Sequence, residues 1–132
     1  MKNSYNIVDI LVGVLQAEDF GITGKVYRQG ERPVDSKKED LVVNTLPVSN
    51  QQIQRSVANI NAHVPNRKIV INGVGNSQPN LTRLEAITSL VCAAVDEQYF
   101  ETYWFFVQQQ STFAEEQETY SNIRIEFYSE NI

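Results

Sequence analysis

The chain contains one histidine and one cysteine, His63 and Cys92, the side chains best suited to proton transfer or nucleophilic attack near neutral pH. An imidazole can act as a general acid or base, but no pattern of Ser, Cys or Asp around His63 specifies a catalytic triad. A zinc site needs several Cys, His or carboxylate ligands, and this chain has only one histidine and one cysteine to contribute. Cys92 lies in the apolar run VCAA, where cysteine packs as a small apolar residue. We therefore expect no catalytic residue, no metal site and no cofactor.

Carboxylates gather in two stretches, residues 96–101 and 115–118. Paired acids catalyse proton transfer only where burial separates their pKa values, and acids close to loops are usually solvated. Asp96 and Glu97 are expected near the C-terminal end of a helix, where the helix dipole favours a cation by about 0.3–1 kcal/mol. A basic surface of a partner, or an Arg or Lys of the same chain, would offset this small cost.

Two further stretches match ligand-binding motifs only in part. NGVGNS, residues 72–77, lacks the lysine of a P-loop and the third glycine of a dinucleotide fingerprint, so it predicts a turn. YFETYWFF, residues 99–106, is rich in aromatic rings that could stack on bases, but acids rather than a basic groove flank it. We interpret it as an aromatic strand of the core.

Length and composition indicate one globular domain. The 132 residues are 42% hydrophobic and 20% charged, with a net charge of −5. This sign disfavours a protein that grips phosphates or an anionic membrane. The apolar N-terminal run is interrupted by Asp9 and has helical spacing, so we interpret it as a helix rather than a signal peptide, and no segment approaches the ~20 apolar residues of a membrane span. We expect a soluble protein, made inside the cell.

Apolar spacing predicts two amphipathic helices, over residues 4–18 and 81–98. Asn3 or Ser4 can cap the first helix. Pro79 and Asn80 open the second helix, and Thr82 with Glu85 would form a capping box if that helix began two residues later. The expected core residues from helices and final strand are Leu11, Leu84, Ile87, Val91, Ile123 and Ile125.

Alternating polarity predicts strands over residues 23–29, 41–46, 51–64, 102–110 and 119–130. The first two strands are expected to form a hairpin with a long charged tip, residues 30–40, that is mobile until it meets a partner. In the third strand the apolar parity changes near Val57, which predicts a bulge, and Pro65 ends the strand.

Between the third strand and the second helix, the apolar patch at residues 69–71 indicates an extra short strand, and residues 111–118 are expected to be an acidic connector between the last two strands. The last strand should bury Ile123, Ile125 and Phe127 and turn Arg124 and Glu126 outward. The fold class is therefore α+β, with a mostly antiparallel sheet of four to five strands covered by two helices in a single domain, residues 1–132.

The layout resembles the tail-terminator proteins (tail-completion or minor tail proteins) of long-tailed phages and prophages. The resemblance spans nearly the whole chain: an N-terminal helix, a charged hairpin, a strand ending in NINAHVPN, a long helix over residues 81–98, and a final strand, YSNIRIEFYSEN. The stretch at residues 69–78 is longer and more apolar than this family leads us to expect.

The resemblance implies a non-enzymatic structural protein of the virion tail, made in the bacterial cytoplasm. Such proteins form a ring, commonly a hexamer, that caps the tail tube, stops its elongation and offers a docking surface to the head. The implied partners are copies of the chain itself, the tail tube protein and the head–tail connector, with no membrane. DNA would pass through without being specifically bound, which an acidic subunit suits because a basic lumen would hold the phosphates.

The candidate contacts with neighbouring subunits or partners are Arg32, Lys37, Lys38, Arg55, Asn59, Asn61, His63, Asp96, Glu97 and Arg124. Three alternatives stay open at the level of sequence. One is a neck or head–tail joining protein of the same virion, and another is a non-viral adaptor domain of the same fold. The third is a small-molecule-binding or enzymatic α+β domain in which residues 99–106 and His63 line a pocket.

Overall fold

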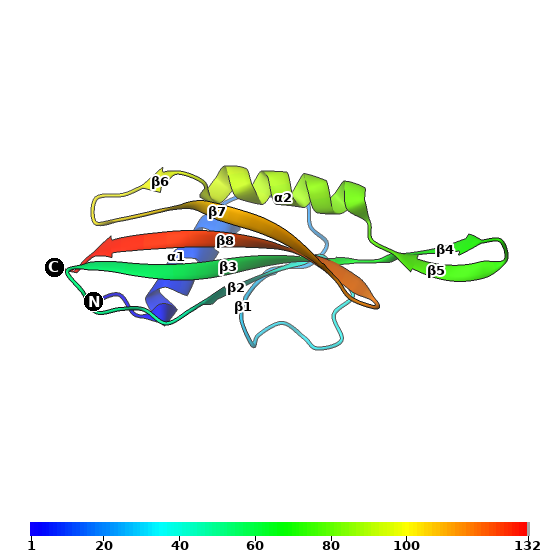
Figure 1. Ribbon diagram of the computed structural model, residues 1–132, viewed down its shortest axis with the longest axis horizontal. Coiled ribbons are helices and arrows are strands. Elements are labelled where there is room, and N and C mark those ends of the chain that lie inside the picture. Colours follow the sequence, from blue (N-terminus) through cyan, green and yellow to red (C-terminus); the bar gives the residue numbers. More distant parts are fainter. Residues whose placement is uncertain (132) are drawn as a thin grey trace.

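The computed structural model describes residues 1–131 as two helices, a six-stranded sheet and a separate two-stranded sheet (Figure 1). The elements in chain order are α1 (Ser4–Gln16), β1 (Val26–Arg28), β2 (Asp40–Thr45), β3 (Ile53–Pro65), β4 (Arg67–Ile71), β5 (Val74–Gln78), α2 (Leu81–Val95), β6 (Gln98–Tyr99), β7 (Tyr103–Ala114) and β8 (Glu118–Glu130). The large sheet has the order β1-β2-β3-β8-β7-β6, and β4 pairs with β5. The α+β class, the two helices and the mostly antiparallel pairing are confirmed, whereas the strand number exceeds the predicted four to five.

Two long strands form the centre of the sheet. β3 and β8 pair antiparallel along their whole length, from Ile53 opposite Glu130 to Pro65 opposite Glu118. β7 pairs with the other side of β8, with a register shift between Val107 and Gln109. The last strand in the sequence is thus an inner strand of the sheet.

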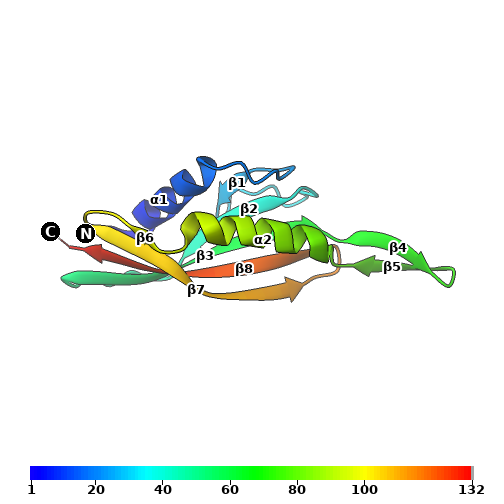
Figure 2. The same cartoon turned by 90° about the horizontal axis from the view of Figure 1, so that it is seen from above.

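Both helices cover the same face of the sheet (Figure 2). Residues of one parity from β3 and β8 point to this face and pack against apolar residues of both helices. The six predicted core residues, Leu11, Leu84, Ile87, Val91, Ile123 and Ile125, all lie in this single buried cluster. The opposite face carries polar and aromatic side chains, and no helix of residues 1–131 lies over it.

The helix starts agree with the predictions, but both helices are shorter. The side chain of Asn3 accepts the N–H of Asn6, and Asn6 reciprocates, so Asn3 is the cap of α1, which ends at Gln16 rather than residue 18. Asn80 caps α2, so the alternative capping box of Thr82 and Glu85 does not form. α2 ends at Val95 rather than residue 98, because Asp96 is extended and Glu97 has a φ of 50°.

The predicted hairpin of the first two strands is wrong. β1 and β2 pair in parallel, with Val26 opposite Leu41, so residues 29–39 form a crossover that returns to the starting end of the pair. Two backbone hydrogen bonds hold the chain together where β1 and β2 begin. Gly24 N–H donates to the Glu39 carbonyl (2.9 Å), and Leu41 N–H donates to the Lys25 carbonyl (3.0 Å). Gly24 is needed for this approach, since a Cβ there would lie 1.7 Å from Asp40 Oδ1.

The predicted parity change in β3 is also wrong. β3 is regular, with Gln54 and Ser56 on its buried face and Ile53 exposed. Gln54 tolerates burial because its amide donates to the backbone carbonyls of Ser49 and Lys2, and its Oε1 accepts the Lys2 N–H. The N-terminal segment thus supplies polar partners that hydrophobic periodicity does not reveal, while Pro65 ends the strand as predicted.

The acidic connector is shorter than expected, because β7 extends through Ala114 and β8 begins at Glu118. Residues 111–114, predicted as connector, are therefore strand. The apolar patch at residues 69–71 belongs to β4, and NGVGNS supplies both a tight turn and most of β5. Asn72 and Gly73 both have positive φ (51° and 77°), as a two-residue hairpin turn requires.

Candidate assembly surfaces

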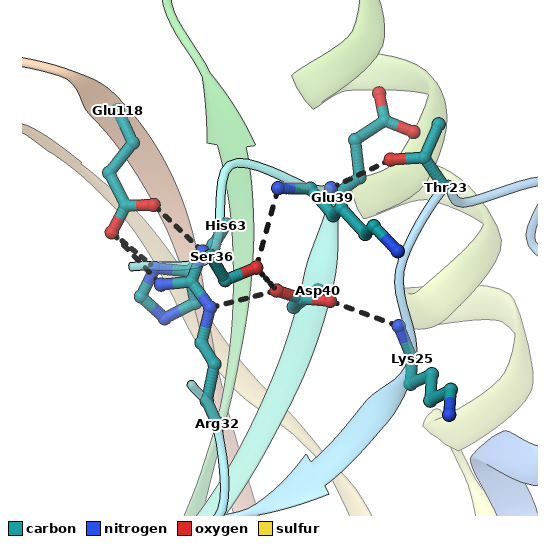
Figure 3. Close-up of polar contacts among 9 residues, drawn as sticks. Thr23, Lys25, Arg32, Ser36, Glu39, Asp40, His63 and Glu118 are labelled. Atoms are coloured by element: carbon teal, nitrogen blue, oxygen red, sulfur yellow. Dashed lines mark hydrogen bonds and ion pairs between the residues drawn. The ribbon is translucent and has the colours of Figure 1, made fainter. Parts of the chain in front are cut away.

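Arg32 ties the β1–β2 crossover to the sheet (Figure 3). Its Nε donates to Asp40 Oδ2 (2.9 Å), while Nη1 and Nη2 donate to the two oxygens of Glu118 (3.1 and 2.9 Å). The Asp40 carboxylate is wholly buried and also accepts the Ser36 hydroxyl and the Lys25 N–H. A forked guanidinium is suited to bridging two carboxylates, so this cluster joins the crossover, β2 and β8.

His63 belongs to the same cluster. Its Nδ1 lies 3.0 Å from Glu118 Oε1, and its ring lies against Tyr120, with centroids 5.1 Å apart. Burial, followed by the positive charge of Arg32, lowers the pKa of His63. The imidazole is therefore neutral at pH 7 and can donate its Nδ1 proton to Glu118.

The two carboxylates of the cluster are held ionised. Burial alone would raise the pKa of Asp40, but hydrogen bonds from Ser36 and Arg32 outweigh it and the pKa is lowered. Glu118 follows the same pattern, with the bonds from Arg32 overcoming burial. Arg32 and His63, predicted as partner contacts, are thus engaged inside the subunit, while Lys37 and Lys38 are exposed on the crossover.

The predicted amide surface lies on the sheet face without helices, and its asparagines bind one another. Asn59 donates to Asn44 (3.1 Å), and Asn122 donates to Asn59 (3.2 Å) and Asn61 (2.7 Å). This ladder crosses β2, β3 and β8 and half-buries its members. The amide groups of NINAHVPN therefore stabilise the sheet. Only the exposed part of these side chains is available to a partner.

The two arginines of this face differ. Arg55 is largely exposed and pairs with Glu126, which also accepts the Tyr128 hydroxyl (3.0 Å). Glu126 points outward as predicted, but these contacts bury it. Arg124 is half-buried, and its Nε has no hydrogen-bond partner among the described residues.

Asp96 has an internal partner that the sequence did not indicate. Its Oδ1 accepts the N–H of Val107 (3.0 Å), at the register shift of β7. A backbone donor, rather than a basic side chain, thus engages this carboxylate beyond the end of α2. Glu97 is exposed beside it.

A pocket shared by residues 99–106 and His63 is ruled out by the register. His63 lies opposite Tyr120 on β8, whereas Phe106, the nearest residue of the aromatic stretch, lies opposite Glu126, six residues further along. At ~3.3 Å per residue the two positions are about 20 Å apart. The small-molecule alternative in that form is therefore wrong.

The β4–β5 hairpin projects from the end of the sheet as an arm, here defined as residues 67–78 (Figures 1 and 2). Its base is fixed by Asn66, which donates to Ser77 (3.1 Å) and accepts the Thr119 hydroxyl (2.8 Å). Further out, Val70, Ile71 and Val74 are 75%, 44% and 63% exposed. The sequence contained a signal for it, an Asn-Gly pair between apolar runs, which predicts a hairpin.

The edge of the large sheet formed by β7 is open along most of its length. β6 pairs with Trp104 and Phe105 of β7, and from Gln108 to Ala114 no strand of the described chain lies on that side. Beside this edge runs a groove of about 350 Å³, lined by α2 and β7 and including Leu81, Leu84, Glu85, Gln110 and Thr112. Sequence patterns could not reveal the edge, because its openness depends on strand order.

Within residues 1–131, no three His, Cys, Asp or Glu side chains gather as a metal-binding group, and no helix is long and apolar enough to cross a bilayer. No family model matches the sequence, and no curated protein is similar enough to match it.

Proposed function

We propose that this chain is a structural assembly subunit that acts as the tail terminator of a long-tailed phage or prophage. In this role its copies form a ring, of six subunits, that caps the tail tube, stops elongation and offers the head a docking surface. The observation that carries an assembly function is the projecting arm with its exposed apolar residues.

The arm is difficult to explain in a protein that acts alone. An isolated two-stranded hairpin is only marginally stable in water, and exposed apolar residues gathered on a projection are typical of contact sites. Val70, Ile71 and Val74 would gain most from burial against another molecule. A partner thus provides the physical reason for the arm.

The polar cluster around Arg32 also supports a structural role. Arg32, Asp40 and Glu118 bind one another, and His63 is neutral against Glu118. These contacts hold a long crossover in place, which is sufficient reason for their presence. We accordingly propose that the chain is not an enzyme and needs no cofactor.

The terminator assignment adds the identity of the partners. The chain would be made in the bacterial cytoplasm, join the virion tail, and contact the tail tube protein and the head–tail connector. Its net charge of −5 suits a channel through which DNA slides without specific binding.

The test uses tail tubes and connectors purified from the same genome. Light scattering and negative-stain imaging should show rings at tube ends and an arrest of tube elongation. Tubes that neither bind the protein nor stop growing would overturn the assignment. Binding to the connector with no effect on tubes would instead identify a neck or head–tail joining protein.

A further inference from the structure

We propose that the arm of one subunit adds to the open edge of β7 in a second copy of this chain, alongside α2. This inference rests on the proposed assembly function, since it names the contact through which copies associate. Strand addition at an open sheet edge supplies main-chain hydrogen bonds, and a neighbouring groove can accept alternate side chains.

The arm has the properties of the inserted element. It is already a pair of extended strands, and no other strand of the described chain pairs with either of them. The register places Ile69, Ile71 and Val74 on one face, which gives the arm an apolar side. Arg67 and Lys68 are its charged residues, and residues 67–78 contain no acid.

The β7 edge has the properties of the acceptor. Its open stretch, residues 108–114, is long enough for a five-residue strand such as β4 or β5. The Glu115 N–H donates to the Glu118 carbonyl (2.8 Å), so by alternation along β7 the N–H and C=O groups of Gln110, Thr112 and Ala114 point to the open edge, where an added strand can bond to them. Leu81 is 67% exposed at the mouth of the groove.

Charge makes the two elements complementary. Glu85 is the charged residue among those that line the groove, and the edge ends at Glu115 and Glu116. A basic arm therefore meets an acidic acceptor, which favours the correct pairing over arm-to-arm contact.

The geometry favours a second copy over the arm's own subunit. The arm leaves the body where β3 ends and extends away from the sheet (Figure 2), so it does not return to its own β7 edge. Donor and acceptor are different surfaces, so each copy gives one arm and receives one. Such heterologous contacts generate a closed ring when the rotation between subunits closes.

The test is cross-linking between two single-cysteine proteins in a Cys92→Ala background. One carries Val74→Cys on the arm and the other Thr112→Cys on the β7 edge; both positions are exposed. A short bismaleimide tolerates small differences of register between them. As the matched control, Val74→Cys is mixed with Arg28→Cys, exposed on β1 at the other edge of the sheet.

The arm–edge pair should give about tenfold more heterodimer than the control, and Ile71→Asp in the arm should lower this yield about tenfold. Val34→Asp, on the exposed crossover, should leave it unchanged. Equal yields for the two cysteine pairs, or no cross-link, would overturn the arm–edge contact.

Analytical sedimentation, without engineered cysteines or cross-linker, provides a second measurement. The wild type should self-associate with rising concentration, while a shortened-arm variant, in which Asn-Gly replaces residues 68–77, should stay monomeric. Arg67 and Gln78 are paired, so a two-residue turn can join them. Unchanged association of this variant would contradict the proposal.

The two proposals fail separately. Cross-linking and sedimentation need no tail tube, so arm–edge pairing without tube capping would overturn the terminator role alone. Capping by rings that show no arm–edge cross-link would overturn the strand addition alone.

Discussion

Asp40 anchors the β1–β2 crossover through its bonds with Arg32 and Ser36. Its buried carboxylate is paired with Arg32, and removing one partner of a buried pair leaves a charge without compensation. We predict that Arg32→Ala lowers the free energy of unfolding by about 3 kcal/mol, measured by urea denaturation. Arg28→Ala is the matched control, because Arg28 forms an exposed pair with Asp9 that should contribute less than about 1 kcal/mol. Equal losses in the two variants would contradict this account.

The lowered pKa of His63 predicts how stability depends on pH. Its ordinary value is 6.5, so just below this pH the unfolded chain binds the proton more readily than the folded chain. The contribution of the neutral imidazole is complete above pH about 6.5 and is lost as the pH falls towards its folded pKa. Asp40 and Glu118, whose pKa values are also lowered, lose their contributions at lower pH, below about 4.

His63→Gln should therefore flatten the curve of unfolding free energy against pH just below 6.5, while keeping the fold and the assembly. Thermal melts at a series of pH values measure the slope. A slope unchanged by the substitution would show that another group titrates there, and loss of a measurable turnover would overturn the non-enzymatic proposal.

Among elements, α2 offers an internal comparison of burial. Leu84 is 5% exposed in the core, whereas Leu81, one turn earlier, is 67% exposed. Leu84→Ala should cost about 2–5 kcal/mol of unfolding free energy, and Leu81→Ala well under about 1 kcal/mol. Similar losses from chemical denaturation of the two variants would mean that the helix packs differently.

The arm should be separable from the body. It contacts the body mainly at its base, through Asn66 and Ser77, and contributes no residue to the buried core. The shortened-arm variant defined above should therefore unfold cooperatively within about 4 °C of the wild type, a shift that corresponds to about 1 kcal/mol for a chain of this length. Calorimetry measures this, and a collapse of the transition would show that the arm supports the fold.

Apolar periodicity predicted those elements whose structure is determined by residues close to them in the sequence. Both helix starts, the inward face of β8 and all six predicted core residues follow from apolar spacing and capping side chains. The parallel pairing of β1 with β2 did not, because Asp40 and Gly24 meet through tertiary contacts. The buried face of β3 was also mispredicted, because Gln54 is buried through side-chain hydrogen bonds that the polarity pattern does not show.

The candidate surfaces were predicted less completely. Polar residue type located the amide ladder and the charged crossover, but it could not reveal that Arg32, His63 and Asp96 bind partners inside the subunit. The open edge of β7 follows from strand order, which short-range patterns do not encode.

For the whole molecule, the charge difference between arm and acceptor predicts salt-sensitive association. Raising NaCl from about 50 mM to about 500 mM shortens the range of electrostatic attraction severalfold and should weaken self-association. Sedimentation equilibrium across this range measures the effect. Association that strengthens with salt would indicate an apolar contact without the proposed pairing of Arg67 and Lys68 with acids.

The central position of β8 has a consequence for synthesis. A ribosome makes residues 1–117 before it makes the strand that joins β3 to β7. Until β8 emerges, the β1–β3 half and the β6–β7 half have no strand between them, and the inner edges of β3 and β7 are open to neighbouring chains. A nascent chain is therefore prone to aggregation until β8 has been translated, and a stop codon before β8 would be far more damaging than the loss of the whole arm.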